Sequence, residues 1–151
     1  MAAYARIAVS RAGAAGFTVS TNAATLTAVA TFAAMAGGAG GTVTHFGLGT
    51  ASTGAGNLIF FGAVTPNLSV VAGVTPKLDT ATSFTQSASD GMTTAAANGF
   101  LLLLLNNTDW ANIGDASGLQ NSAADGNFYL SLHTGSPGEG GSQTTSEIAY
   151  T

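Results

Sequence analysis

The stretch Leu58-Ile59-Phe60-Phe61-Gly62-Ala63-Val64 decides how the fold is assembled, because it contains no polar residue. A strand with one face in water alternates apolar and polar side chains, whereas this stretch has no polar face. We therefore expect either a central strand of a sheet or a strand that a neighbour covers.

Further strand-like segments lie on both sides of this stretch and are separated by Gly, Pro and Asn. Such punctuation is typical of antiparallel β proteins. The expected strands cover residues 4–10, 17–20, 24–32, 42–49, 80–86 and 128–134, with a hairpin formed by 68–71 and 74–78. Residues 135–146 form a long, polar, Gly-rich loop with room to move. The predicted fold class is mainly β, an antiparallel sandwich or jelly-roll-like domain.

One apolar helix is expected at residues 93–106, where alanines and leucines follow a threonine that can cap the first turn. A buried strand is the competing interpretation, because short apolar runs do not reveal their period. Consecutive leucines point all round a helix, so we expect burial against the sheet or another subunit. The assembly residues predicted here are Phe100, Leu101, Leu102, Leu103, Leu104 and Leu105.

The composition favours association between copies of the chain. Charged residues make up only 7% of the 151 residues, against a usual share of about 25%, and mixed surface charge is what opposes association. The only cations are Arg6, Arg11 and Lys77, so no nucleic-acid partner is expected. Without cysteine there are no disulfides or thiolate metal sites. The apolar run at 100–105 is far shorter than the roughly 20 residues that span a bilayer, so no membrane partner is expected.

The two ends of the chain read as halves of one interrupted strand segment, residues 146–151 followed by residues 2–9. Residues 87–91 have the composition of a flexible linker, and Met92 resembles a natural start. These features predict a single β domain over 1–151 that is circularly permuted, with 1–86 as the parental C-terminal part and 92–151 as the parental N-terminal part. In the alternative, Met92 is an ordinary internal methionine.

Joining the ends also brings Glu147 close to Arg6, which predicts an ion pair between strands or between subunits.

The histidines do not predict a catalytic or metal site. His45 and His133 each lie inside a strand without a carboxylate or second histidine beside them. A Ser/His/acid group can be assembled from Ser131, His133 and Asp115 or Glu147, but no nucleophile elbow supports it. We expect structural histidines and no enzyme.

The remaining polar motifs predict no cofactor and no metal ion. The loop acids lack the alternating pattern of a calcium loop, so turn and capping roles are expected of Asp109, Asp115, Asp125 and Glu139. The glycine-rich segment 37–41 lacks the Lys and Ser/Thr of a phosphate loop. Trp110 is interpreted either as a core plug at the end of the helix or as a platform for stacking a sugar.

The chain resembles a group of small tailed-phage virion proteins, usually described as tail fibre or structural proteins, some of them similar to capsid cement proteins. The segments that carry the resemblance are Asn112 to Asp115, Phe128 to Glu139, Gln143 to Glu147, Tyr4 to Val9, Thr42 to Ser52 and Gly56 to Pro66. In that group the Ser-Leu-His-Thr block precedes the Tyr-Ala-Arg block, whereas here it follows. We interpret the reversed order as an engineered circular permutation.

The resemblance implies a non-enzymatic structural protein that assembles into a homo-oligomer or filament. Its implied partners are copies of itself together with phage capsid or tail proteins, and its implied location is the virion, or the cytoplasm when the permuted chain is expressed recombinantly. Predicted assembly or structural residues are Arg6, Glu147 and Trp110 in addition to the apolar helix. The rival hypothesis is a receptor- or glycan-binding module of a tail fibre, which would use Trp110, Asn127 and Tyr129 beside loops 114–127 and 135–146.

Overall fold

The computed structural model describes residues 3–86 and 91–151, which fall into two compact units. Unit 1 comprises Met1–Ala8, Val29–Asp79 and Phe128–Thr151, and unit 2 comprises Val9–Ala28 and Thr80–Asn127. Antiparallel strands dominate and a single α-helix accompanies them in the described part of the chain, so the prediction of a mainly β fold is confirmed. Most of the expected linker, residues 87–90, lies outside the described residues.

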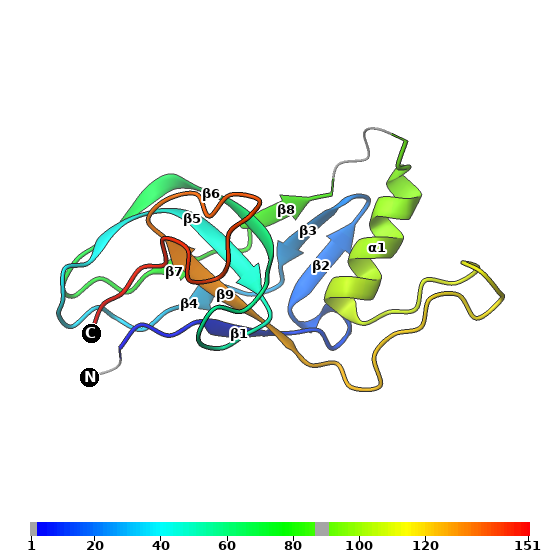
Figure 1. Cartoon of the computed structure of the whole chain (residues 1–151), viewed down its shortest axis with the longest axis horizontal. Helices are drawn as coiled ribbons and strands as arrows, with labels where there is room; N and C mark the ends of the chain where they lie inside the picture. The colour runs from blue at the N-terminus through cyan, green and yellow to red at the C-terminus, as the bar shows by residue number, and fades with distance from the viewer. Residues whose placement is uncertain (1–2, 87–90) are drawn as a thin grey trace. The chain divides into compact units, whose positions relative to one another are not determined.

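The largest sheet has four strands in the order β1-β9-β5-β6 (Figure 1), and β5, β6 and nearly all of β9 belong to unit 1, whereas the unit boundary falls within β1. The strands of this sheet are β1 (Ile7–Ser10), β9 (Asn127–His133), β5 (Gly41–Gly49) and β6 (Leu58–Val70). A second, two-stranded sheet pairs β4 (Ala30–Thr31) with β7 (Lys77–Leu78).

The two faces of the larger sheet carry different side chains. Phe46 pairs with Leu132 and with Gly62, and Leu48 pairs with Leu130 and with Phe60. We call this side the core face, because Phe46, Leu48, Leu130 and Leu132 are buried. The other side, which we call the loop face, carries Gly47, Ser131, His133, Phe61 and Ala63, where Gly47 pairs with Ser131 and with Phe61.

The structure corrects two expectations about the apolar stretch. β6 is an edge strand of the sheet, so a central position for residues 58–64 is wrong, and the alternative, a strand that a neighbour covers, stays a prediction. β6 also continues through Pro66 to Val70, and β7 pairs with β4, so the hairpin of 68–71 with 74–78 does not form. Pro66 lies where the pairing with β5 is irregular, between the Val43–Leu68 and His45–Ala63 pairs, and proline is tolerated at such irregularities.

Unit 2 packs its helix beside a small sheet in the order β2-β3-β8 (Figure 1). The elements are η1 (Gly13–Ala15), β2 (Phe17–Ser20), β3 (Ala23–Leu26), β8 (Ser83–Thr85) and α1 (Thr94–Asn106). The expected strand at 24–32 is divided, since β3 and β4 belong to different sheets.

The predicted helix is confirmed, with its cap. The Ala96 amide donates to Thr93 Oγ1 at 3.2 Å, and the helix ends at Asn107 in the left-handed conformation with φ of 49°. No helix among the described residues is long and apolar enough to cross a membrane.

Within the single chain, the helix is buried on one face only. Ala97, Leu101 and Leu105 are fully buried, because a spacing of four residues places them on one face. Leu102, Leu103 and Leu104 are only half-buried, and 37% of Phe100 is exposed. The flank of α1 is therefore apolar and partly open.

Candidate functional site

A part-buried ion pair ties the first residues of unit 1 to its last ones. Arg6 contacts Glu147 through two bonds of 2.7 Å, Nε to Oε1 and Nη2 to Oε2. The same guanidinium donates to the carbonyl oxygens of Ala51 at 2.9 Å and Gly54 at 2.8 Å. Only 3% of the Arg6 side chain is exposed. The pair therefore lies within one chain, and it fixes the β5–β6 loop.

Tyr4 extends this cluster. Its hydroxyl donates to Glu147 Oε1 at 3.0 Å and accepts from the Leu132 amide at 2.9 Å. Burial raises the pKa of Tyr4, and the hydrogen bond to Glu147 raises the pKa of Arg6. Each polar atom here contacts another protein group, so the cluster fastens β9 to both ends of unit 1.

Ser131 and His133 form a hydrogen-bonded pair on the loop face of β9. His133 Nδ1 lies 2.8 Å from the Thr145 carbonyl oxygen, and Nε2 lies 2.8 Å from Ser131 Oγ. Because a carbonyl only accepts, Nδ1 carries the proton and Nε2 accepts from the serine hydroxyl. Burial lowers the pKa of His133, which favours this neutral form.

The Ser131–His133 pair has the arrangement of an activated nucleophile but no access to a substrate. Both side chains have 0% exposure. Gly47 of β5 lies directly against them, since a Cβ there would be 2.6 Å from Nε2 and 2.8 Å from Ser131 Oγ. The pair therefore serves as a buried hydrogen bond, in agreement with a structural role for His133.

Sequence reasoning missed Gln143, whose side chain is also completely buried. Its Oε1 accepts from the Ala51 amide at 2.9 Å, and its backbone amide donates to the Gly56 carbonyl at 3.2 Å. The side chain occupies the space above Gly49 and Gly56, where no Cβ would fit. The loop at 135–146 is therefore anchored towards its C-terminal end, contrary to the expectation that it had room to move.

The other polar residues make local contacts. His45 Nδ1 lies 2.9 Å from Thr44 Oγ1. Asp115 Oδ1 accepts from the amides of Ser117 and Gly118 at 2.8 and 3.0 Å, and Asp109 Oδ1 accepts from the Asn121 amide at 2.7 Å. No group of three or more His, Cys, Asp or Glu side chains that could hold a metal ion occurs among the residues that were described.

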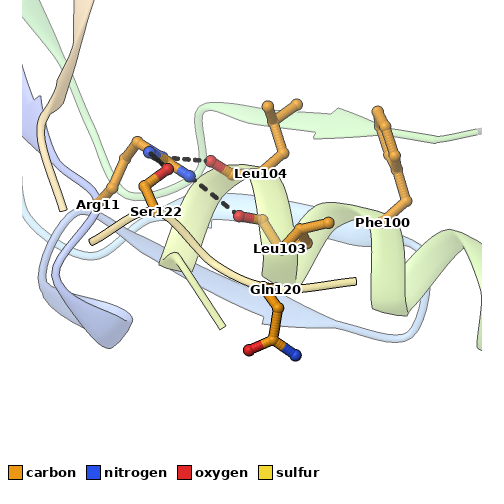
Figure 2. Close-up of a pocket in the computed structure, with 6 residues that line it drawn as sticks. All are labelled: Arg11, Phe100, Leu103, Leu104, Gln120 and Ser122. Atoms are coloured by element: carbon orange, nitrogen blue, oxygen red, sulfur yellow. Dashed lines mark hydrogen bonds between the residues drawn. The ribbon is translucent and has the colours of Figure 1, made fainter. Parts of the chain in front are cut away.

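Unit 2 has a cavity of about 170 Å³ beside α1, drawn in Figure 2. Arg11 closes one end, where its Nε donates to the Leu104 carbonyl at 2.6 Å and its Nη2 to the Leu103 carbonyl at 3.1 Å. A cation at this position satisfies the last carbonyls of a helix and interacts favourably with its dipole. The remaining lining residues are Phe100, Leu103, Leu104, Gln120 and Ser122.

The residues of the glycan hypothesis are not gathered within one unit. Trp110 and Asn127 belong to unit 2, whereas Tyr129 belongs to unit 1. The Trp110 ring packs on Gly99 of α1, because a Cβ on that glycine would lie 2.6 Å from the ring atoms Cε2 and Nε1. Trp110 thus fills the space beside the helix.

The outer edge of unit 1 is the exposed counterpart of these buried clusters. On the loop face of β6, 37% of Ile59 and 36% of Phe61 are exposed, and Ala63 beyond them is exposed as well. We call these three residues and the backbone of β6 beside them the β6 edge. β6 contains no charged residue over its 13 positions.

Comparison of the chain with known protein families finds a match to one family model. The family model described as podophage GP4 fiber I protein gp80 matches residues 1–87, which is more than half of the chain and includes β1 to β8. No curated protein and no solved structure matches the chain. The chain therefore belongs to the podophage GP4 fiber I protein gp80 family.

Proposed function

We propose that this chain is a non-enzymatic structural subunit of a phage fibre and that it works by associating with copies of itself into a homo-oligomer or filament. Membership of a phage fibre family supports a structural role and suggests a location in the virion. Phage tail or capsid proteins are the further partners that we propose on the same ground.

The observation that carries the proposal is the combination of a nearly uncharged chain with large apolar side chains left in solvent. The chain has 3 basic and 7 acidic residues in 151. Mixed surface charge keeps monomers apart, so a chain with so little charge has little to oppose contact between its exposed apolar side chains. The large apolar side chains with substantial exposure in the described residues are Val29, Ile59, Phe61, Val71, Met92, Phe100, Ile113 and Leu119.

The buried polar clusters support the non-enzymatic part of the proposal. Ser131 and His133 are the groups that could form a nucleophile and its base, and their position beneath Gly47 leaves no exposed atom. Arg6 and Glu147, which we predicted as assembly or structural residues, bond within one chain. These groups hold the β5–β6 loop and the C-terminal segment on the sheet.

The test is the mass of the purified chain by light scattering on a sizing column, with the same fractions viewed by electron microscopy. We expect a discrete oligomer or a filament. A chain that stays monomeric at all concentrations up to the millimolar range would overturn the proposal. Turnover on ester or glycoside substrates, abolished by Ser131→Ala, would overturn its non-enzymatic part.

We also propose that the chain is an engineered circular permutant. The Tyr4 amide donates to the Tyr150 carbonyl at 3.1 Å, so the two described ends lie side by side, as a permuted domain requires (Figure 1). The family match ends at residue 87, at the start of the expected linker. Natural domains also have neighbouring ends, so the test is a chain in the parental order, 92–151 followed by 3–86. We expect it to fold and assemble like the present chain, and failure to fold would contradict the proposal.

A further inference from the structure

We propose that two copies of this chain pair through α1, with the apolar flank of one helix packed antiparallel on the same flank of the other. We call the four residues that form this surface, Ala96, Phe100, Leu103 and Leu104, the α1 flank. The inference rests on the proposed self-association and names its surface. It concerns unit 2 alone, since α1 and the residues that line the cavity beside it belong to that unit.

The first step is that α1 carries two apolar stripes. Successive residues of a helix turn by about 100°, so Ala97, Leu101 and Leu105 share one face, which is fully buried. The α1 flank covers a second arc of about 100°, and there the side chains are half-buried or, at Phe100, 37% exposed. A helix with one buried face normally carries charged and polar residues elsewhere. α1 has no charged residue over its 13 positions.

The second step is that the cavity of about 170 Å³ adjoins the α1 flank (Figure 2). Phe100, Leu103 and Leu104 line it, and the side chains of Phe100 and Leu104 project from the helix in the same direction. An apolar cavity of about 150 Å³ holds a benzene ring. The cavity beside α1 therefore has the size and the lining that suit the ring of one phenylalanine.

The third step selects a second copy as the occupant, because the α1 flank is symmetric about Phe100. This residue is the middle one of the helix, with Ala96 four positions before it and Leu104 four positions after it. A two-fold axis at Phe100 places Ala96 of each copy opposite Leu104 of the other, a small side chain against a larger one. It also brings each Phe100 ring to the cavity of the other copy. Such a contact is isologous, so it closes a two-fold dimer.

The charges near the α1 flank also favour an identical partner. Two copies of a charged surface repel each other when they meet, because like charges are juxtaposed. The α1 flank meets its own copy without this cost. Arg11 donates to the carbonyls of Leu103 and Leu104 at one end of the helix, so an antiparallel pair holds the two guanidinium groups near its opposite ends.

The absence of cysteine from the native chain permits a test by single cysteine substitution. Packed helices lie about 8–10 Å apart and their Cα atoms lie about 2.3 Å from each axis, so the two Cα atoms of residue 100 come within about 6 Å, which a disulfide bridges. Phe100→Cys should therefore give a covalent dimer on oxidation, seen on a non-reducing gel. The matched control is Ala95→Cys, exposed on the same helix but outside the α1 flank, which should give at least tenfold less dimer.

The register is tested by mixing two further variants. Ala96→Cys mixed with Leu104→Cys should cross-link with a short bismaleimide at least threefold more than either variant alone, since these two positions face each other. Equal yields in the mixture and the single variants would overturn the antiparallel register. Equal disulfide yields of the variants at 100 and 95 would overturn the α1 flank as the contact.

A charge substitution gives an independent readout without oxidation. Phe100→Glu places two like charges opposite each other at the centre of the pair, which is unfavourable. Light scattering should show the particle mass falling at least twofold, while Ala95→Glu keeps the native mass. Circular dichroism of both variants shows whether the helix is retained.

The outcomes separate this inference from the proposed function. A native chain that is monomeric overturns both. A native oligomer whose mass survives Phe100→Glu, with cross-linking at 100 no greater than at 95, overturns only the role of the α1 flank. The same holds if Phe100→Glu destabilises the chain without changing its mass, because the flank then serves the fold of its own chain. If this variant loses its helix signal, the cysteine results decide.

Discussion

β9 and β6 lie on opposite sides of β5, yet one is sealed and the other is open. Leu130, Ser131, Leu132 and His133 of β9 all have 0% exposure, although two of them are polar. On β6, Ile59 and Phe61 have 37% and 36% exposure, although both are apolar. The comparison shows that polarity does not decide burial here. Polar groups are buried where a partner in the same chain satisfies them, and apolar groups stay exposed at the edge of the sheet.

The largest effect is expected from Glu147→Ala, which breaks the sealed side. Arg6 would keep a side chain that is only 3% exposed and lose both bonds to the carboxylate. Removing one partner of a fully buried pair costs about 3–5 kcal/mol. Because this pair is part-buried and Arg6 keeps its bonds to the Ala51 and Gly54 carbonyls, we expect the lower end of that range, about 3 kcal/mol. Urea denaturation measures the loss of unfolding free energy. Glu139→Ala removes the same group from an exposed position and should change stability by less than about 0.5 kcal/mol. Equal effects of the two variants would contradict the buried pair.

A smaller effect is expected from Gly47→Ala, which pushes a methyl group into the Ser131–His133 pair. The new Cβ would lie 2.6 Å from His133 Nε2 and 2.7 Å from Leu58 Cδ1. Overpacking of this kind costs about 1–3 kcal/mol. The control is Gly140→Ala, where nothing lies within 4 Å. A melting temperature for Gly47→Ala as high as that of the control would show that the loop face is not closely packed there.

The sealed side also predicts a dependence of stability on pH. Burial lowers the pKa of His133 in the folded protein. The unfolded chain therefore binds a proton at a higher pH than the folded one, so the contribution of His133 is fully present above its unfolded pKa of about 6.5 and is lost as pH falls below it. The slope of unfolding free energy with pH can reach about 1.4 kcal/mol per pH unit. Denaturation curves between pH 7 and 5 measure it. We expect His133→Gln to flatten the slope, and an unchanged slope in this variant would show that the dependence does not come from His133.

The sequence predicted the elements that depend on local signals. The helix at 93–106 was recognisable from the Thr93 cap and the leucines, and the structure begins it at Thr94. β2 and β9 followed from strand-forming runs bounded by turn residues. The Arg6–Glu147 contact could be predicted from the sequence because the two ends of the chain read as one strand segment.

The rest depended on pairing between distant segments. Nothing within residues 58–64 shows whether the strand has one neighbour or two, because strand order is set by non-local partners. Gln143 gave no signal, since a glutamine in a polar loop resembles any exposed loop residue. Its burial follows from the space above Gly49 and Gly56, two glycines that only the folded chain brings to it. The exposed apolar side chains of β6 therefore emerged from its apolar sequence and its edge position together.

The smallest effect on folding is expected from Ile59→Thr on the open side. Threonine keeps the branched shape that suits a strand and removes apolar surface that is already 37% exposed. The unfolding free energy of the single chain, measured at the lowest concentration that gives a signal, should fall by no more than about 1 kcal/mol. A large loss of stability would mean that Ile59 serves the fold of its own chain, as Leu130 does, and that the contrast between the two strands is one of degree.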